Sequence, residues 1–271
     1  MTTFSTIESL FDYLWQDYGK LNPSAIKVHS ILQAHGEKVL NDHVAFRSFN
    51  TPELNLEKMS KVFLKHGYKV EGEYTFVEKK LFAKHFEHPD KTKPKVFISH
   101  LEIEKLSAKA QQIIHSLTAQ VPRDFSSQEA FCVSGRPWTV TYSEYQTLLQ
   151  ESEYAAWMAA FGFRVNHFTV NVNALTRFKD LTQLNEFIKS NGYKLNSAGG
   201  EIKGSKEVYL EQSSTLAEKV KVNFADGTYE IPSVYYEFAL RYKLPTGVLY
   251  QGFVEKSADK IFESTDTKHQ R

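Results

Sequence analysis

A repeated segment constrains the fold of this chain more than any other feature. Residues 41–49, Asn-Asp-His-Val-Ala-Phe-Arg-Ser-Phe, resemble residues 165–173, Val-Asn-His-Phe-Thr-Val-Asn-Val-Asn, and in each copy a histidine opens a predicted strand. An amphipathic helix follows each strand and ends at a Gly-Tyr-Lys turn, which starts at Gly67 in the first copy and at Gly192 in the second. Matching elements in the same order and at nearly the same spacing indicate an internal duplication.

Each copy is predicted to be a βαβββ-type module. Aromatic and β-branched residues typical of strands follow the turn, and a Pro-led strand is expected to close each module, over 94–99 in the first copy and 232–237 in the second. The predicted fold class is therefore α+β. Two duplicated βαβββ-type modules would form a curled mixed sheet with flanking helices, and the cup of this sheet would centre on a metal.

The remaining segments are assigned around these modules. We divide the chain into five parts of one integrated domain: N-terminal helices (1–40), the first module (41–104), a mainly helical connector (105–162), the second module (163–242) and a C-terminal tail or lid (243–271). Ser5 and Glu8 form a predicted capping box, and Asn22 caps the second helix. In the connector we expect helices over 107–119 and 143–161 with a hairpin through 135–137 between them, and in the tail a short helix over 257–265.

Charge and cysteine content limit the possible partners. The 33 Lys and Arg residues nearly balance 32 Asp and Glu, so nothing electrostatic favours binding to nucleic acid or to an anionic membrane. No apolar run approaches the roughly 20 residues that cross a bilayer. The single Cys132 cannot form an intramolecular disulfide, and the first residues lack a secretory pattern, which together indicate a reducing, cytoplasmic setting. We expect a small-molecule partner, and the oligomeric state stays open.

Alternation along the predicted strands brings polar side chains to one face. These are His43 and Arg47 on the first strand, His167 and Thr169 on its counterpart, and Tyr235, Glu237 and Arg241 on the closing strand. If the opposite, apolar face packs under the helices, then His43, His167 and Glu237 can converge inside the curled sheet. Two imidazoles and one carboxylate are the facial triad of non-haem Fe(II) oxygenases, so we predict a metal centre at these residues.

Each of these residues also has a structural interpretation. A single strand histidine is usually a hydrogen-bonded part of the fold, and it is the equivalent repeat positions of His43 and His167 that favour a metal site. Arg47 suits a substrate carboxylate, which it could bind with two parallel hydrogen bonds, or a structural ion pair, and both alternatives stay open. The competing cluster, His85-Phe-Glu-His88, runs into a Pro-Asp turn and is predicted to be an exposed surface patch.

Four short segments resemble a known family. They are Asp42-His-Val-Ala-Phe-Arg47, Asn166-His-Phe168, Tyr236-Glu-Phe-Ala-Leu-Arg241 and Ile261-Phe-Glu-Ser-Thr265. Together they resemble the 2-oxoadipate dioxygenase/decarboxylase family, which is itself similar to the vicinal oxygen chelate superfamily with its paired βαβββ modules. The resemblance implies that His43, His167 and Glu237 bind Fe(2+), that Arg47 and the two histidines contact the substrate, and that these four residues are catalytic.

The activity implied by the resemblance is that of a non-haem iron oxidoreductase. It would convert 2-oxoadipate, or a similar 2-oxo dicarboxylate, with O₂ to 2-hydroxyglutarate and CO₂, without a separate 2-oxoglutarate. One alternative keeps the fold but uses redox-silent Zn or Ni in an isomerase or hydrolase. Another is a non-catalytic small-molecule binding module. Oxygen consumption separates the iron oxygenase from the Zn or Ni enzyme. Tight binding of a small molecule without a metal would favour the binding module.

Overall fold

The structure is a computed structural model that describes residues 3–255, and the predicted helix over 257–265 lies outside these residues. The described chain divides into two compact units, and each unit combines three segments: residues 3–18, 45–166 and 219–231 in unit 1, and residues 19–44, 167–218 and 232–255 in unit 2. Each unit combines segments that are distant in the sequence, whereas each of the five predicted parts is one continuous segment. Those five parts therefore stay a prediction.

The βαβββ order occurs twice. The first copy contains β1 (Asn41–Phe49), α3 (Leu56–Lys65), β2 (Lys69–Phe76), β3 (Leu81–Glu87) and β4 (Lys95–Leu101). The second copy contains β5 (Val165–Asn171), α7 (Leu181–Ser190), β6 (Lys203–Ser205), β7 (Leu210–Ser214) and β10 (Glu237–Arg241), with a hairpin of β8 (Lys219–Phe224) and β9 (Gly227–Pro232) inserted before the last strand. The predicted α+β class of two duplicated modules is confirmed.

In unit 1 the first module forms an antiparallel meander. β3 pairs with β2 on one side and with β4 on the other, and α3 packs against β4. The α3 helix begins where the Asn55 side chain accepts a hydrogen bond from the Lys58 N–H, and it buries Met59 and Phe63 on one face. It ends before Gly67, whose φ of +91° favours glycine. The Gly-Tyr-Lys turn thus ends the helix as predicted.

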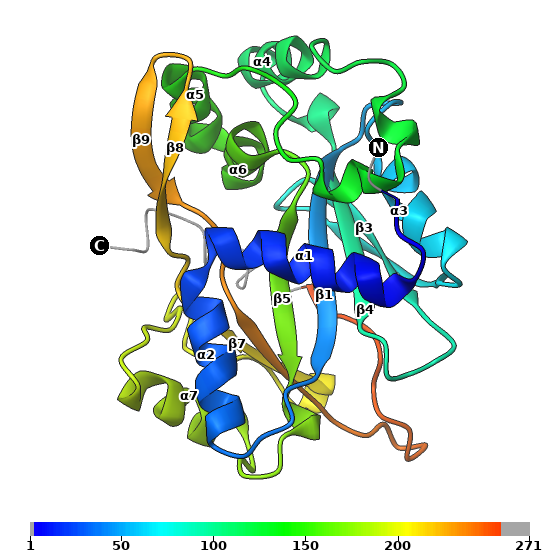
Figure 1. The fold of residues 1–271 in the computed structure, drawn as a ribbon, viewed down its shortest axis with the longest axis vertical. Helices are drawn as coiled ribbons and strands as arrows, with labels where there is room; N and C mark the ends of the chain where they lie inside the picture. Colours follow the sequence, from blue (N-terminus) through cyan, green and yellow to red (C-terminus); the bar gives the residue numbers. More distant parts are fainter. Residues whose placement is uncertain (1–2, 256–271) are drawn as a thin grey trace. The chain divides into compact units, whose positions relative to one another are not determined.

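The connector differs from its prediction in two places. The single helix expected over 143–161 is two helices, α5 (Tyr142–Glu151) and α6 (Glu153–Phe161), which pack with α4 (Ala108–Thr118) (Figure 1). They separate at Ser152, which is extended and whose hydroxyl caps α6. The hairpin expected through 135–137 is wrong, because Gly135 pairs instead with Phe163 in an isolated antiparallel bridge.

The β8–β9 hairpin belongs to unit 1, although it interrupts the second module in sequence. The ring of Tyr229 on β9 stacks on Tyr142 at the start of α5, with ring centroids 3.7 Å apart. Asp226 in the turn accepts a hydrogen bond from the Tyr142 N–H at 2.6 Å. A local sequence pattern did not predict this insertion, since its partners lie about 80 residues earlier in the chain.

In unit 2 the second module forms a mixed sheet. β10 runs parallel to β5 and antiparallel to β7, which also pairs with β6. The closing strand expected over 232–237 is shifted: β9 ends at Pro232, and β10 begins only at Glu237. Residues between the two strands make separate hydrogen bonds outside the strand ladders. The Ser233 N–H donates to the Glu218 carbonyl, and the Tyr236 N–H donates to the Thr215 hydroxyl. Glu237 is therefore the first residue of its strand.

Two N-terminal helices form as predicted, α1 (Ile7–Leu21) and α2 (Pro23–Ala34), and Asn22 caps the second. The capping box expected from Ser5 and Glu8 is wrong. Thr6 and Ser9 exchange the reciprocal hydrogen bonds instead, while Glu8 pairs with Lys93. Across the described residues, none of the helices combines the length and the apolar character that a membrane crossing requires.

Candidate metal centre

His43, His167 and Glu237 converge within unit 2, as predicted. The Nε2 atoms of His43 and His167 lie 3.5 Å and 3.4 Å from Oε1 and Oε2 of Glu237, respectively. One ligand atom from each residue lies within 4.8 Å of the others, and residues 3–255 contain no other group of three His, Cys, Asp or Glu side chains with such spacing. The three residues are 2%, 4% and 0% exposed. The cluster could hold a metal ion in a site closed to bulk water.

Strand register explains the convergence. Glu237 opens β10 directly opposite Thr169 of β5, and His167 lies two residues earlier on the same face of β5. The Thr169 hydroxyl lies 3.1 Å from Nε2 of His43. Because each of the three candidate ligands sits on a hydrogen-bonded strand, the backbone fixes their spacing before any metal binds.

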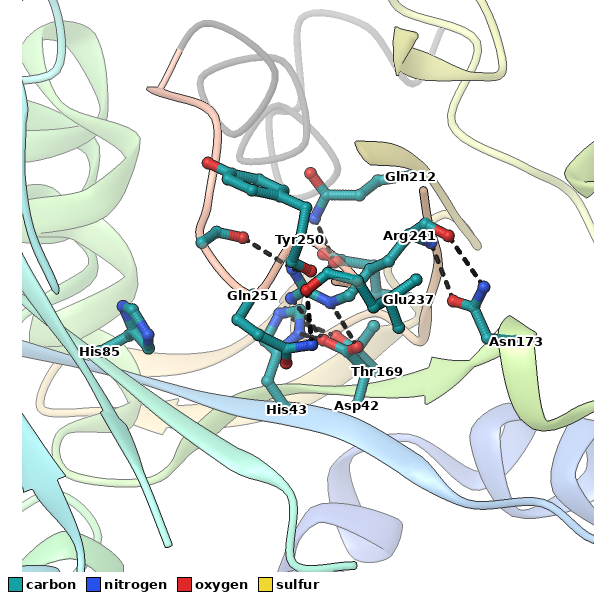
Figure 2. A network of polar contacts seen from close by, with 12 residues as sticks. Asp42, His43, His85, Thr169, Asn173, Gln212, Glu237, Arg241, Tyr250 and Gln251 are labelled. Atoms are coloured by element: carbon teal, nitrogen blue, oxygen red, sulfur yellow. Dashed lines mark hydrogen bonds and ion pairs between the residues drawn. The ribbon is translucent and has the colours of Figure 1, made fainter. Parts of the chain in front are cut away.

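Asp42 orients His43. Its Oδ1 atom lies 2.8 Å from Nδ1 of His43, and its two oxygens accept hydrogen bonds from Arg241 at 2.7 Å and 2.8 Å (Figure 2). A carboxylate at Nδ1 favours the tautomer that carries its proton there. The Nε2 lone pair is then directed toward Glu237, where it can serve as a metal ligand.

Glu237 carries the electrostatic signature of a cation site. Gln212 donates a hydrogen bond to Oε1 at 2.6 Å, whereas Oε2 has no hydrogen-bond partner among the described residues. Burial, together with the negative charge of Asp42, raises the pKa of Glu237 to about 8 and outweighs the hydrogen bonds and Arg241, which lower it. A buried carboxylate with an unsatisfied oxygen beside two imidazoles fits a divalent cation, which would hold it in the charged form.

The outer residues of the cluster were not predicted. Tyr235 was placed on the Glu237 face without a role, and its ring stacks on His167 with centroids 4.7 Å apart. Asp42 could have been found, because it directly precedes His43 in the sequence. Gln212 gives no local signal, since it reaches Glu237 only through the pairing of β7 with β10.

Arg47 lies in unit 1, where it forms an ion pair. Its side chain is 2% exposed and donates a hydrogen bond from Nη1 to Oε1 of Glu153 at 2.9 Å. It also lies over the rings of Tyr154 and Trp157, 4.8 Å and 5.2 Å from their centroids. The structural alternative for Arg47 is thus partly realised, with Glu153 as the partner, and the substrate contact stays a prediction.

In the second histidine cluster His85 and Glu87 are buried and His88 is half-buried, so the prediction of an exposed patch is wrong. His85 and Glu87 are 3% and 7% exposed, because β3 is the middle strand of its meander. The Tyr74 hydroxyl lies 2.8 Å from Nδ1 of His85, Nε2 lies 3.3 Å from Glu87, and Lys91 pairs with Glu87 at 2.6 Å. Although burial opposes it, the hydrogen bonds from His85 and Lys91 lower the pKa of Glu87 to about 2. The polar groups of His85 and the charge of Glu87 are thus compensated by neighbouring side chains.

Paired βαβββ modules with a buried His-His-Glu cluster define a class of protein with a candidate mononuclear metal centre. The sequence model of the 2-oxoadipate dioxygenase/decarboxylase family matches residues 12–135 and 129–247. A curated relative from Arabidopsis thaliana, "2-oxoadipate dioxygenase/decarboxylase, chloroplastic", is 34% identical over 281 residues, which cover 92% of this chain and 74% of the relative. The chain belongs to this family.

Solved structures agree on the fold. The hydroxyglutarate synthase of Oryza sativa in complex with 2-oxoadipate is 33% identical, with a TM-score of 0.89 over 97% of this chain and 94% of that one. A Shewanella frigidimarina protein with a provisional hydrolase name is 52% identical, with a TM-score of 0.90 over 94% and 100%. A glyoxalase superfamily structure from Ralstonia eutropha, 21% identical with a TM-score of 0.72 over 90% and 84%, shares the fold.

The predicted cytoplasmic setting is contradicted by the relatives. The Arabidopsis protein is named chloroplastic, and a relative from Oryza sativa subsp. japonica, 34% identical over 92% of this chain, is named chloroplastic/amyloplastic. The prediction rested on the single Cys132 and on the first residues of the chain. A cysteine count reports on redox conditions and does not distinguish one reducing compartment from another.

Proposed function

We propose that this chain is an Fe(2+)-dependent dioxygenase and decarboxylase that converts 2-oxoadipate, or a similar 2-oxo dicarboxylate, with O₂ to 2-hydroxyglutarate and CO₂. The observation that carries the proposal is the buried triad of His43, His167 and Glu237, in which Oε2 of Glu237 has no hydrogen-bond partner among the described residues. Membership of the family supports the reaction, and the 2-oxoadipate complex of the rice relative supports the substrate class.

The reaction balances without another oxidant or reductant. One carboxyl carbon of the six-carbon substrate leaves as CO₂, and the two atoms of O₂ are retained in the products. His43, His167 and Glu237 would hold the metal through two nitrogens and a carboxylate, the donor set of the facial triad. When bound, the metal would supply a Lewis-acid centre for the 2-oxo acid and coordination positions for O₂.

The remaining groups of the site would position and protect the reacting atoms. Asp42 keeps the Nδ1 proton on His43, and Gln212 fixes one oxygen of Glu237. Tyr235 and Phe253, which are 0% and 7% exposed, cover the histidine rings with apolar surface. Exclusion of water strengthens the electrostatic contacts within the site and limits side reactions.

Arg47 is proposed to bind the distal carboxylate of the substrate. Its planar fork suits two parallel hydrogen bonds to a carboxylate, and the two flanking rings hold it in one orientation. Because Glu153 already accepts a hydrogen bond from Nη1, a bound carboxylate would have to share the guanidinium with Glu153 or displace it. Arg47→Lys should therefore raise KM for 2-oxoadipate more than it lowers kcat.

Oxygen uptake tests the proposed function. Protein reconstituted anaerobically with Fe(II) and given 2-oxoadipate in aerated buffer should consume O₂ and release CO₂ and 2-hydroxyglutarate in equal amounts. His43→Ala should abolish this uptake. The matched control is His100→Ala, which removes a half-buried strand histidine outside the triad and should leave the uptake unchanged.

A hydrolase is the second candidate, because the 52% identical Shewanella protein carries that provisional name. The same cluster could hold Zn(II) or Ni(II), which activate water without redox chemistry. A chain that binds metal in the triad and consumes no O₂ with 2-oxoadipate would contradict the oxygenase proposal and favour this alternative. Tight binding of the oxo acid without any metal would instead favour a binding module.

A further inference from the structure

Arg241 joins two parts of unit 2 through one guanidinium. Its Nε and Nη2 atoms donate to the two carboxylate oxygens of Asp42 at 2.7 Å and 2.8 Å. Its Nη1 atom donates to the carbonyl oxygens of Tyr250 and Gly252 at 3.3 Å and 2.7 Å (Figure 2). The side chain is almost fully buried. One group therefore holds both Asp42 and the C-terminal segment 250–253.

The Asp42 end of this link reaches a candidate metal ligand. Asp42 contacts Nδ1 of His43 at 2.8 Å, and such outer-shell carboxylates fix both the tautomer and the ring orientation of a ligating histidine. The paired hydrogen bonds from Arg241 fix the plane of the Asp42 carboxylate, which a single contact would leave free to rotate. Arg241 thus acts on His43 through Asp42.

The other end of the link covers the same histidine. The Phe253 ring lies edge-on to His43, with centroids 4.8 Å apart and planes at 88°, and it also lies 5.2 Å from the Arg241 guanidinium. The Tyr250 hydroxyl donates to the Phe253 carbonyl at 3.1 Å, which stiffens the segment. The position of the ring that covers His43 therefore depends on a segment that Arg241 holds through its carbonyls.

We propose that Arg241 is a positioning residue that couples the orientation of His43 to the closure of residues 250–253 over it. The inference rests on the proposed metal centre and adds to it a route from the ligand to the C-terminal segment. Coupling between two events is reciprocal. Metal binding should therefore tighten the segment, and loss of the Arg241 contacts should weaken metal binding.

The first test is an anaerobic Co(II) titration without substrate, followed by the visible absorption of the bound ion. Arg241→Lys and Asp42→Asn should each weaken Co(II) binding by about 10- to 100-fold and shift the spectrum, as outer-shell changes do. Because both residues act on His43 by the same route, the double variant should bind within about twofold of the weaker single variant. If the loss of Co(II) affinity in the double variant equals the product of the two single losses, Arg241 acts by a route that does not include Asp42.

The matched control is Arg136→Lys. Arg136 also donates to two main-chain carbonyls, those of Ala160 and Asn223, and lies 5.8 Å from the Phe224 ring, so its hydrogen bonds go to carbonyl oxygens and not to a carboxylate. It belongs to unit 1, whereas the triad residues belong to unit 2. Its variant should bind Co(II) within about twofold of the wild type, which separates the general effect of replacing a half-buried arginine from loss of this coupling.

The second test needs no folded Arg241 variant. Hydrogen exchange of the backbone amides in 246–254, measured by mass spectrometry on the wild type, should slow when Co(II) binds, and Asp42→Asn should remove this slowing. An exchange rate in 246–254 that does not change when Co(II) binds would contradict the proposed coupling. Wild-type Co(II) affinity in Arg241→Lys would also contradict it. Neither readout involves turnover. A wild type that passes both tests yet consumes no O₂ would contradict the proposed function alone.

Discussion

The two buried histidine and glutamate clusters of this chain have similar components and opposite electrostatics. In unit 1, both ring nitrogens of His85 have partners, and Lys91 neutralises Glu87, whose pKa is lowered to about 2. In unit 2, two imidazoles face Glu237, one of whose oxygens lacks a hydrogen-bond partner among the described residues, and its pKa is raised to about 8. The residue types of the two clusters alone do not show which cluster binds a metal.

The difference shows how a structural cluster can be distinguished from a ligand-binding one. A cluster that satisfies its donors, acceptors and charges internally is stable as it stands. The Glu237 cluster keeps a buried carboxylate whose charged form lacks sufficient compensation, so its free energy improves when a cation binds. The convergence of three ligand atoms and the Glu237 oxygen without a hydrogen-bond partner among residues 3–255 therefore indicate which cluster suits a metal.

The largest expected effect is on metal affinity. Glu237→Gln should weaken Fe(II) or Co(II) binding by more than about 100-fold, beyond the range of outer-shell changes, because it removes a charged ligand. Its matched control, Glu87→Gln, should bind metal like the wild type. Metal titration followed by elemental analysis measures both. Equal metal affinity in Glu237→Gln and Glu87→Gln would contradict the proposal that only the Glu237 cluster binds the metal.

The two carboxyl groups should also give metal-free stability opposite pH dependences. The pKa of Glu237 in the fold, about 8, exceeds its ordinary 4.5, so the fold holds this proton more tightly than the unfolded chain does. Its stabilising contribution is complete below about pH 4.5 and is lost as pH rises toward 8. Urea unfolding of metal-free protein should show this loss in the wild type and not in Glu237→Gln.

For Glu87 the sign reverses. Its folded pKa of about 2 lies below 4.5, so its contribution is present above about pH 4.5 and is lost as pH falls toward 2. Glu87→Gln should cost roughly 1–3 kcal/mol of unfolding free energy at neutral pH, because a charge-assisted hydrogen bond is lost in a mainly buried position. The same variant should show a smaller loss of stability in acid, and an unchanged acid profile would contradict this assignment.

The smallest effect is expected at the edge of the unit 1 cluster. Tyr74→Phe removes the hydroxyl 2.8 Å from Nδ1 of His85 and should cost about 1 kcal/mol, the usual net value of one hydrogen bond. Metal affinity should not change. Urea unfolding checks the first statement and Co(II) titration the second, and a weaker metal complex would show that the two clusters are not independent.

The sequence predicted the inner cluster because repetition is a local signal. His43 and His167 open equivalent strands, and Glu237 was recognised on the closing segment even though its strand starts later than expected. The exposed patch at His85 was predicted from the Pro and Lys residues that follow it. Burial of His85 depends on β3 lying between two other strands, which neighbouring residues do not encode.

The outer contacts were missed for the same reason. Arg241 meets Asp42 across 199 positions of the chain, and Gln212 meets Glu237 through the register of β7 and β10. Helix limits were predicted where a cap or a glycine marks them, as at Gly67, and failed at Ser152, which ends one helix and caps the next. Most of the features that the sequence did not predict depend on contacts between residues that are distant in the chain.

Anomalous diffraction at the iron absorption edge would locate bound iron in the protein directly. Crystals grown anaerobically with Fe(II) should give one strong peak per chain, roughly 2.0–2.2 Å from Nε2 of His43, Nε2 of His167 and a Glu237 oxygen, the distances usual for such ligands. That result would establish the triad as a metal centre. A peak at His85 and Glu87, or no peak at the triad in protein that carries iron, would contradict the assignment of His43, His167 and Glu237 as metal ligands.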